Sequence, residues 1–391
     1  MSRYRKEFDH KLSTTVLISI LYPLGPAAII LSPMIVGGVI DSYGFTEQQA
    51  GMLASLEGMG LVVASILATV WIRKRSWTGV LFFGLLLTAA LNLISSNLDE
   101  FVPLTIVRFF AGFTGGTVFA VAVVALGDNR EPDRAFGIAQ AMQGAMMFVA
   151  FTAAPPLMRA FGVSGLFYML AAASILMMLS LFRFPDQGVI RTELATEAEA
   201  GNGNTRLIWL GLFASFIFFL NIFGLWAFVE RIGQAAQLPP NTIGLALGVS
   251  QIAAIGGALA AALASDRYGR TVPLLIVLVG QSLVLWALVG KFGSVTFFIG
   301  TSIFQALFMI AVSYQMGAIA RIDIKGKFLV LMTAAQGLGA AFGPSIAAVL
   351  IREGDDYSGI NLMAGFCCLF GCLLFVFIIR RSHQLMAAAD R

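Results

Sequence analysis

The sequence predicts an all-α membrane protein of twelve transmembrane helices, arranged as two similar six-helix bundles. Three observations carry this prediction: the chain is strongly apolar, apolar segments of spanning length recur along it, and residue patterns repeat at a near-constant offset. Of its 391 residues, 58% are hydrophobic and 12% are charged, whereas soluble domains carry about 25% charged residues. With a mean hydropathy of +0.87, the chain needs lipid as the solvent for much of its surface.

A membrane-crossing helix needs about 20 mostly apolar residues, and twelve such segments are present. They cover residues 12–40, 47–71, 77–96, 101–126, 135–158, 165–184, 207–230, 241–264, 272–290, 294–319, 327–351 and 359–379. The first is longer than the apolar core of a signal peptide, about 7–15 residues, so we expect it to be retained. Pro23, Pro26 and Pro33 predict that this span is kinked.

Lysine and arginine indicate the orientation, because short cytoplasmic loops carry an excess of them. With the N-terminus in the cytoplasm, 20 basic residues fall on the inner side and 4 on the outer side. We therefore expect both termini in the cytoplasm and a location in the bacterial inner membrane. The longest connection, 185–206, contains several glutamates and a Gly-Asn-Gly sequence. It predicts a cytoplasmic linker between an N-terminal bundle, 1–184, and a C-terminal bundle, 207–391.

An internal repeat supports the division into two halves. Gln143-Gly144 in the fifth span recurs as Gln336-Gly337 in the eleventh, at an offset of 193 residues. Arg75 after the second span recurs as Arg270 after the eighth, at an offset of 195. Since both halves would begin in the cytoplasm, we expect parallel repeats about an axis along the membrane normal.

Several function classes find no support in the sequence. The three cysteines share one apolar segment, 367–372, which is typical of small apolar side chains on a membrane helix rather than of a disulfide or metal site. The only histidines, His10 and His383, lie in charged tails, which excludes a histidine proton relay in the membrane. No catalytic constellation or nucleotide-binding loop is present, so we expect no enzyme, cofactor, metal or nucleic-acid partner, and no ATP-driven pump.

A loop motif carries a family resemblance. The segment after the eighth span reads Ala262-Leu-Ala-Ser-Asp-Arg-Tyr-Gly-Arg270. It resembles the cytoplasmic loop signature of the major facilitator superfamily, Gly-x-x-x-Asp-Arg-x-Gly-Arg, with Ala262 in place of the first glycine. The loop after the second span keeps the basic residues but lacks the aspartate and the glycine. The gate-loop residues that the resemblance implies are Arg73, Arg75, Asp266, Arg267, Gly269 and Arg270.

Two membrane segments extend the resemblance. The fourth span contains Arg108-Phe-Phe-Ala-Gly112-Phe-Thr-Gly115 and resembles the family's fourth-helix motif, Arg-x-x-x-Gly-x-x-Gly. The eleventh span carries Gly339-Ala-Ala-Phe-Gly-Pro344, which is similar to a motif associated with antiporters, although in the family that motif belongs to the fifth span. The resemblance implies a twelve-helix secondary transporter that works by alternating access, and it leaves the direction of transport open.

Ionisable side chains at membrane depth are costly and indicate function. Glu57 lies about 15 Å into the second span and Arg108 about 10 Å into the fourth, both counted from the outer surface at 1.5 Å per residue. The two depths permit contact. Burial favours the neutral form of a carboxyl, whereas a nearby arginine favours the charged form. The pair is therefore a candidate for proton coupling and solute binding; the alternative is a permanent ion pair that only orients helices.

Uncharged polar groups at mid-depth are further candidates for solute binding, and interhelical hydrogen bonding is the alternative for each. Gln251 stands 194 residues after Glu57 and is its uncharged counterpart in the repeat. Glu230 and Arg231 end the seventh span on its outer side and are expected to form a solvated pair at the rim. The candidate solute-binding residues, besides Glu57 and Arg108, are Tyr22, Asn221, Gln251, Gln305, Tyr314 and Gln336.

The sequence thus predicts a monomeric, proton-coupled transporter of a small organic solute, which would be amphipathic, aromatic or a carboxylate. The alternative is a proton antiporter that exports drugs or metabolites rather than an uptake symporter. A non-transporting membrane receptor is a third hypothesis, but it would normally require a soluble signalling domain. The expected partners are the solute, protons and the lipid bilayer.

Overall fold

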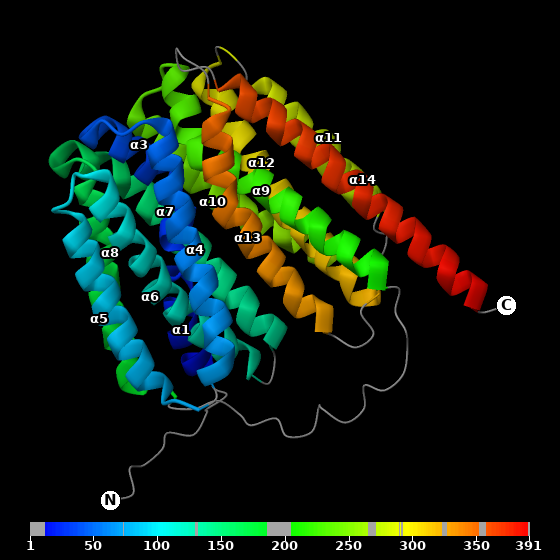
Figure 1. Ribbon diagram of the computed structural model, residues 1–391, viewed down its shortest axis with the longest axis horizontal. Helices are drawn as coiled ribbons and strands as arrows, with labels where there is room; N and C mark the ends of the chain where they lie inside the picture. The colour runs from blue at the N-terminus through cyan, green and yellow to red at the C-terminus, as the bar shows by residue number, and fades with distance from the viewer. Residues whose placement is uncertain are drawn as a thin grey trace, which may run out of the picture. The chain divides into compact units, whose positions relative to one another are not determined.

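The computed structural model of the chain describes residues 12–72, 74–129, 132–185, 205–264, 271–288, 290, 292–322, 327–351 and 357–389. Every regular element in these residues is a helix (Figure 1). The chain divides into two compact units, Met1–Thr192 and Glu193–Arg391. Each unit is a bundle with its own buried apolar core.

The first unit begins with a broken span. Its pieces are α1 (Leu12–Leu21), the short 3-10 helix η1 (Tyr22–Leu24), α2 (Ala27–Ile30) and α3 (Ser32–Tyr43). Pro23 lies in the first turn of η1, Pro26 directly precedes α2, and Pro33 lies in the first turn of α3. Proline has no backbone N–H and disrupts the preceding turn of a helix. The kink that the sequence predicts is therefore a series of breaks.

Longer helices complete the first unit. They are α4 (Glu47–Trp71), α5 (Trp77–Ser95), α6 (Phe101–Gly127), α7 (Pro132–Phe161) and α8 (Ser164–Met178), which continues into the 3-10 helix η2 (Leu179–Arg183). Helix α4 begins with a capping box, in which Thr46 Oγ1 accepts from Gln49 N at 3.2 Å and Gln49 Oε1 accepts from Thr46 N at 3.0 Å. This cap satisfies two otherwise unpaired N–H groups and fixes where α4 starts.

Six helices lie in the described residues of the second unit. They are α9 (Thr205–Ala235), α10 (Pro240–Ala264), α11 (Thr271–Ala287), α12 (Ser294–Ile322), α13 (Lys327–Val349) and α14 (Ser358–Ala389). Phe308 of α12 stands close to three rings of α9, with centroid distances of 5.5 Å to Phe219, 6.2 Å to Phe223 and 6.3 Å to Phe218. Aromatic packing of this kind joins α9 to α12.

The helices of the two units repeat at a near-constant offset. The first residue of α10 follows that of α4 by 193 residues, that of α12 follows α6 by 193, and that of α13 follows α7 by 195. The packing repeats too, because α4 packs on α6 as α10 packs on α12, and α5 packs on α8 as α11 packs on α14. The two units therefore share the order and the packing of these helices.

Glycines bring α4 and α6 into backbone contact. A Cβ atom added to Gly112 would overlap the carbonyl oxygen of Glu57, and one added to Gly60 would overlap the carbonyl oxygen of Phe109. A Cβ on Gly116 would stand 2.7 Å from Leu61 Cα. Small residues allow membrane helices to approach this closely. Glu57 is thus carried on a backbone that lies directly against the helix of Arg108.

The helices are long and apolar enough to cross a membrane. Nine helices in the described residues meet that criterion, and Ser13–Leu24 and Val272–Ala287 are shorter apolar helices. Large apolar side chains are exposed on both units, including Phe182 and Trp286, which are 77% and 79% exposed. A surface of this composition fits lipid rather than water.

Candidate functional site

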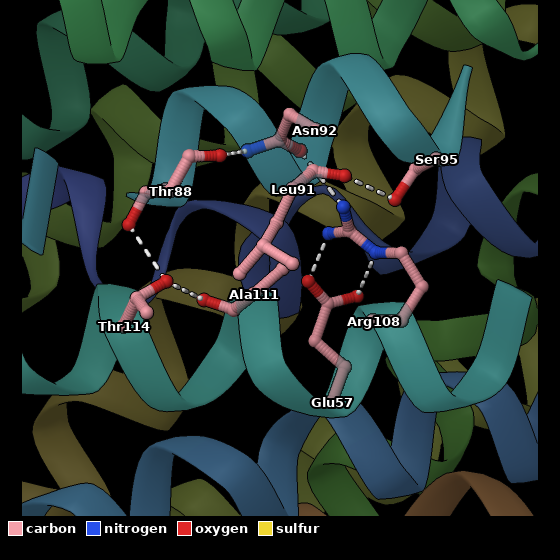
Figure 2. Close-up of polar contacts among 8 residues, drawn as sticks. All are labelled: Glu57, Thr88, Leu91, Asn92, Ser95, Arg108, Ala111 and Thr114. Carbon is pink, nitrogen blue, oxygen red and sulfur yellow. Dashed lines mark hydrogen bonds and ion pairs between the residues drawn. The ribbon is translucent and has the colours of Figure 1, made fainter. Parts of the chain in front are cut away.

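Helices α4 and α6 bring Glu57 and Arg108 together, as their matching depths in the sequence predict. Arg108 Nε donates to Glu57 Oε2 at 3.1 Å, and Arg108 Nη2 donates to Glu57 Oε1. Figure 2 shows the carboxylate facing the guanidinium along one edge. The two side chains are 3% and 1% exposed. A forked contact of this type is the strongest form of arginine–carboxylate pairing.

Arg108 has two further partners on other helices. Its Nη1 donates to Asn92 Oδ1 of α5 at 2.8 Å, and its Cζ lies 4.9 Å from the ring centroid of Phe167 of α8. Asn92 is 2% exposed and Phe167 is fully buried. A cation over an aromatic face is attracted by the ring quadrupole. Four helices therefore surround one guanidinium.

Neither of these partners is among the residues that the sequence predicts for the site. Asn92 lies four residues before the short connection 96–100, and Arg108 lies eight residues after it on the next, antiparallel span. The nearness of both residues to one connection is a signal in the sequence for Asn92. Phe167 carries no comparable signal, since phenylalanine is abundant in the chain, with 33 residues.

A row of hydrogen bonds extends from the ion pair along α5 and α6. Asn92 Nδ2 donates to the carbonyl oxygen of Thr88 at 2.8 Å. The hydroxyls of Thr88 and Thr114 lie 2.8 Å apart, as Figure 2 shows. Thr88 Oγ1 also lies 2.8 Å from the carbonyl oxygen of Gly84. The row ties the orientation of the Asn92 amide to the backbone of α5, because a carbonyl accepts only from the amide nitrogen.

A small cavity of about 20 Å³ adjoins the pair. To hold one water molecule, a cavity must leave about 10–15 Å³ open to the centre of the molecule and must offer it polar partners. Polar and apolar side chains share its wall: Leu24, Gly25, Ala28, Ile29, Glu57, Leu61, Thr88, Asn92, Arg108, Ala111, Gly112, Gly115 and Leu170. The space therefore suits a water molecule and is too small for an organic solute in this conformation.

The charge balance of the site depends on Glu57. With Glu57 ionised, the pair is neutral, and both charges are hydrogen-bonded. With Glu57 protonated, the buried guanidinium carries an uncompensated charge, which is costly away from water. A proton at Glu57 therefore changes the electrostatics of the whole cluster.

Tyr22 lies in the first unit but outside this cluster. Its hydroxyl accepts from Gln140 Nε2 of α7 at 3.4 Å, and its ring centroid is 5.0 Å from that of Phe119. It is 8% exposed. Tyr22 is thus a buried residue that links η1 with α6 and α7.

The predicted polar residues of the second unit are all buried. Asn221 is fully buried, and both of its amide atoms lack a hydrogen-bond partner in the part of the chain that is described. The same holds for Nε2 of Gln251 and of Gln336. The other two members of the set, Gln305 and Tyr314, are 8% and 6% exposed.

Asn221 lies on the side of α9 opposite Phe219 and Phe223. It is two residues from each of them, and both rings contact Phe308. At 3.6 residues per turn, two residues correspond to a rotation of about 160° between side chains.

The positions of the second unit that correspond to the ion pair carry uncharged residues. At the offset of 194 residues, Gln251 corresponds to Glu57 and Ser302 corresponds to Arg108. Gln251 is 7% exposed, as a buried counterpart should be. The charge asymmetry that the sequence predicts is therefore present in the described residues of α10 and α12.

The expectation for Glu230 is wrong. The side chain is 3% exposed rather than solvated, and its Oε1 accepts from Gln234 Nε2 at 2.5 Å. Arg231 Nη1 donates to Gln234 Oε1 at 2.5 Å. Gln234, one helical turn later, thus bridges the acid and the base, and packing around the end of α9 excludes water from the carboxylate.

The gate loops are described only in part. Arg75 lies directly after α4 and is exposed. The other gate-loop residues of the sequence analysis lie outside the described residues: Arg73, Asp266, Arg267, Gly269 and Arg270.

The fold and the buried charge pair define the class: a polytopic α-helical membrane protein built from two six-helix units. Comparison with known proteins supplies the family. The family model described as Major Facilitator Superfamily matches residues 16–209 and 211–389, so the chain belongs to this superfamily. The predicted fold class and family are confirmed, and the chain is a membrane transporter, not an enzyme.

Solved structures share the fold. The nucleoside transporter NupG is 16% identical with a TM-score of 0.72, over 95% of this chain and 99% of that one. A D-xylose-proton symporter is 14% identical with a TM-score of 0.72, over 92% and 96%. A bacterial homologue of the human lysosomal transporter Spinster is 12% identical with a TM-score of 0.73, over 95% and 97%. No curated protein sequence matches the chain.

Proposed function

We propose that this protein is a proton-coupled secondary transporter of a small organic solute, working by alternating access, and that Glu57 with Arg108 is its proton-coupling site. The observation that carries the proposal is the forked Glu57–Arg108 pair, 3% and 1% exposed, in two membrane helices. Intramembrane charges are rare and mark ion pathways and proton relays. A similar fold in a D-xylose-proton symporter is compatible with this chemistry.

The surroundings of the pair favour coupling over a merely structural role. The adjoining cavity has room for one water molecule, and a water molecule in contact with Glu57 is a means of delivering a proton. A pair that only oriented helices would need no such space. The proton would neutralise Glu57 and release one partner of Arg108.

Solute binding is assigned to a different set of residues. Arg108 already has Glu57, Asn92 and Phe167 as partners, so it is closed to a solute carboxylate in this conformation. The proposed contacts are the buried polar side chains Tyr22, Asn221, Gln251, Gln305, Tyr314 and Gln336. With the many phenylalanines of the chain, they suit an amphipathic or aromatic solute, whereas a carboxylate solute would need a conformation in which Arg108 is released from Glu57.

The proposed setting follows from the charge distribution. The excess of lysine and arginine in alternate loops, 20 against 4, favours cytoplasmic termini. We place the protein in a bacterial inner membrane, where a proton gradient is maintained, and propose that it acts as a monomer.

The test is transport by purified protein in proteoliposomes. A thermal-shift screen with a panel of organic solutes first identifies a ligand. The Glu57→Gln variant should then lose accumulation of that ligand driven by an imposed pH gradient, while solute exchange without a gradient continues. Glu47→Gln, the same change on the same helix but outside the buried cluster, should accumulate solute like the wild type.

The result also separates symport from antiport. An inward proton gradient that concentrates the solute inside the vesicle indicates symport, and one that drives the solute out indicates antiport. If Glu57→Gln still concentrates solute against its gradient when the pH step is imposed, the coupling role is wrong.

A further inference from the structure

The three partners of Arg108 come from three helices, and only one of them carries a titratable group. We propose that Asn92 and Phe167 are positioning residues that hold Arg108 in place when Glu57 is neutral, so that Glu57 is the member of the pair that moves. This inference rests on the proposed function, because proton uptake is the event that would neutralise Glu57.

The contacts of the guanidinium are divided between separate N–H groups. Nε and Nη2 face Glu57, whereas Nη1 donates to Asn92 Oδ1 at 2.8 Å. Loss of the carboxylate contacts therefore leaves the Asn92 bond and the stacking on Phe167 in place. Asn92 is itself fixed, because its Nδ2 donates to the Thr88 carbonyl oxygen at 2.8 Å.

The backbone beneath Glu57 is held as well. Gly112 abuts the Glu57 carbonyl oxygen, and Gly60 abuts the Phe109 carbonyl oxygen, so α4 and α6 are in backbone contact at two points close to the pair. Parting of the pair by separation of the helices would break this packing. Rotation of the flexible Glu57 side chain would not, and the cavity beside it offers space of about 20 Å³.

The test is a double-mutant cycle on the melting temperature of the purified full chain, and it needs no solute. Asn92→Leu should lower the melting temperature more in the Glu57→Gln background than in the wild type, because the buried cation then has no carboxylate partner and depends more on the Asn92 amide oxygen. The expected difference is about 2–4 °C or more. Equal losses in the two backgrounds would overturn the inference. In the extreme case, both single variants can be purified as folded protein and the double variant cannot.

A second cycle uses Asn92→Asp, which places a carboxylate where Nη1 already donates. In the wild type it adds a second negative charge to a neutral pair. In Glu57→Gln it restores the charge balance around Arg108, so the loss of melting temperature should be smaller there. Aspartate cannot donate to the Thr88 carbonyl oxygen as Asn92 does, but this loss is the same in both backgrounds and cancels. A loss that is equal or larger in Glu57→Gln contradicts the proposal.

Matched variants complete the design. Thr114→Val removes a hydroxyl that lies 2.8 Å from Thr88 Oγ1 but does not contact Arg108, so its effect should be the same in both backgrounds. Phe167→Leu should behave like Asn92→Leu. If the flux test fails but the cycles are non-additive, Arg108 is anchored as proposed and has no coupling role. If the flux test succeeds but the cycles are additive, only the anchoring is overturned.

Discussion

Gly112 of α6 lies directly against the carbonyl group of Glu57. The glycine stands one helical turn after Arg108, and the carbonyl belongs to the residue whose carboxylate Arg108 binds. Backbone contact and ion pair are therefore two parts of one junction between α4 and α6. The close approach of the two backbones lets the Glu57 and Arg108 side chains meet directly.

A methyl group at Gly112 should disrupt this junction. Gly112→Ala places Cβ on the Glu57 carbonyl oxygen, and overpacking of this kind costs about 1–3 kcal/mol. Gly127→Ala is the control, because a Cβ there meets nothing within 4 Å. Unfolding in detergent measures both variants. A Gly112→Ala protein as stable as Gly127→Ala would show that the helices can separate freely at this level.

Removal of Arg108 alone should destabilise the protein more than removal of both Glu57 and Arg108. Arg108→Leu leaves the Glu57 carboxylate buried without its cation, and breaking a buried pair in this way costs about 3–5 kcal/mol. The double variant Glu57→Leu with Arg108→Leu should regain much of that loss, since no charge remains to be buried. Denaturant titration gives the two free energies of unfolding. A double variant that is no more stable than Arg108→Leu contradicts this account.

The charge distribution predicts opposite sides for the two ends of α5. Lys74 and Asp99, both exposed, flank that helix. In a cysteine-free background, Lys74→Cys should react with a membrane-impermeant thiol reagent only in inverted vesicles, and Asp99→Cys only in right-side-out vesicles. The reverse pattern would place the termini outside the cell.

Asn221 should report on solute binding. Its amide is fully buried with no hydrogen-bond partner among the described residues, a state that costs about 1–3 kcal/mol. Asn221→Leu, similar in shape, should therefore raise the melting temperature of the protein alone. If Asn221 binds the solute, the same variant should lose the melting-temperature increase that the screened ligand gives the wild type. An unchanged ligand-induced increase would remove Asn221 from the proposed binding residues.

Helix spans and the Glu57–Arg108 contact could be predicted because both depend on depth alone. Apolar length determines where a span lies, and residues at similar depth in neighbouring spans can meet. Pro23, Pro26 and Pro33 likewise predicted disruption of the first span, since proline acts through its own backbone.

Other contacts depend on which faces of the helices meet, and the sequence does not state this. Phe167 is one of 33 phenylalanines, and only packing of α8 against the cluster selects it. Glu230 was expected at a solvated rim because it is charged and near a helix end. It is buried by the packing around α9, and Gln234 donates to its Oε1.

The two units differ in charge: one carries Glu57 and Arg108, and the other carries Gln251 and Ser302 at the corresponding positions. This difference limits how steeply the transporter can concentrate its solute. Under the proposed coupling, this location exchanges a single proton in each turnover. One proton provides about 1.4 kcal/mol per unit of pH difference and about 2.3 kcal/mol per 100 mV of membrane potential. With one unit of pH difference and 100 mV together, a neutral solute can be accumulated at most about 500-fold. A second titrating pair, with a second proton, would square this limit.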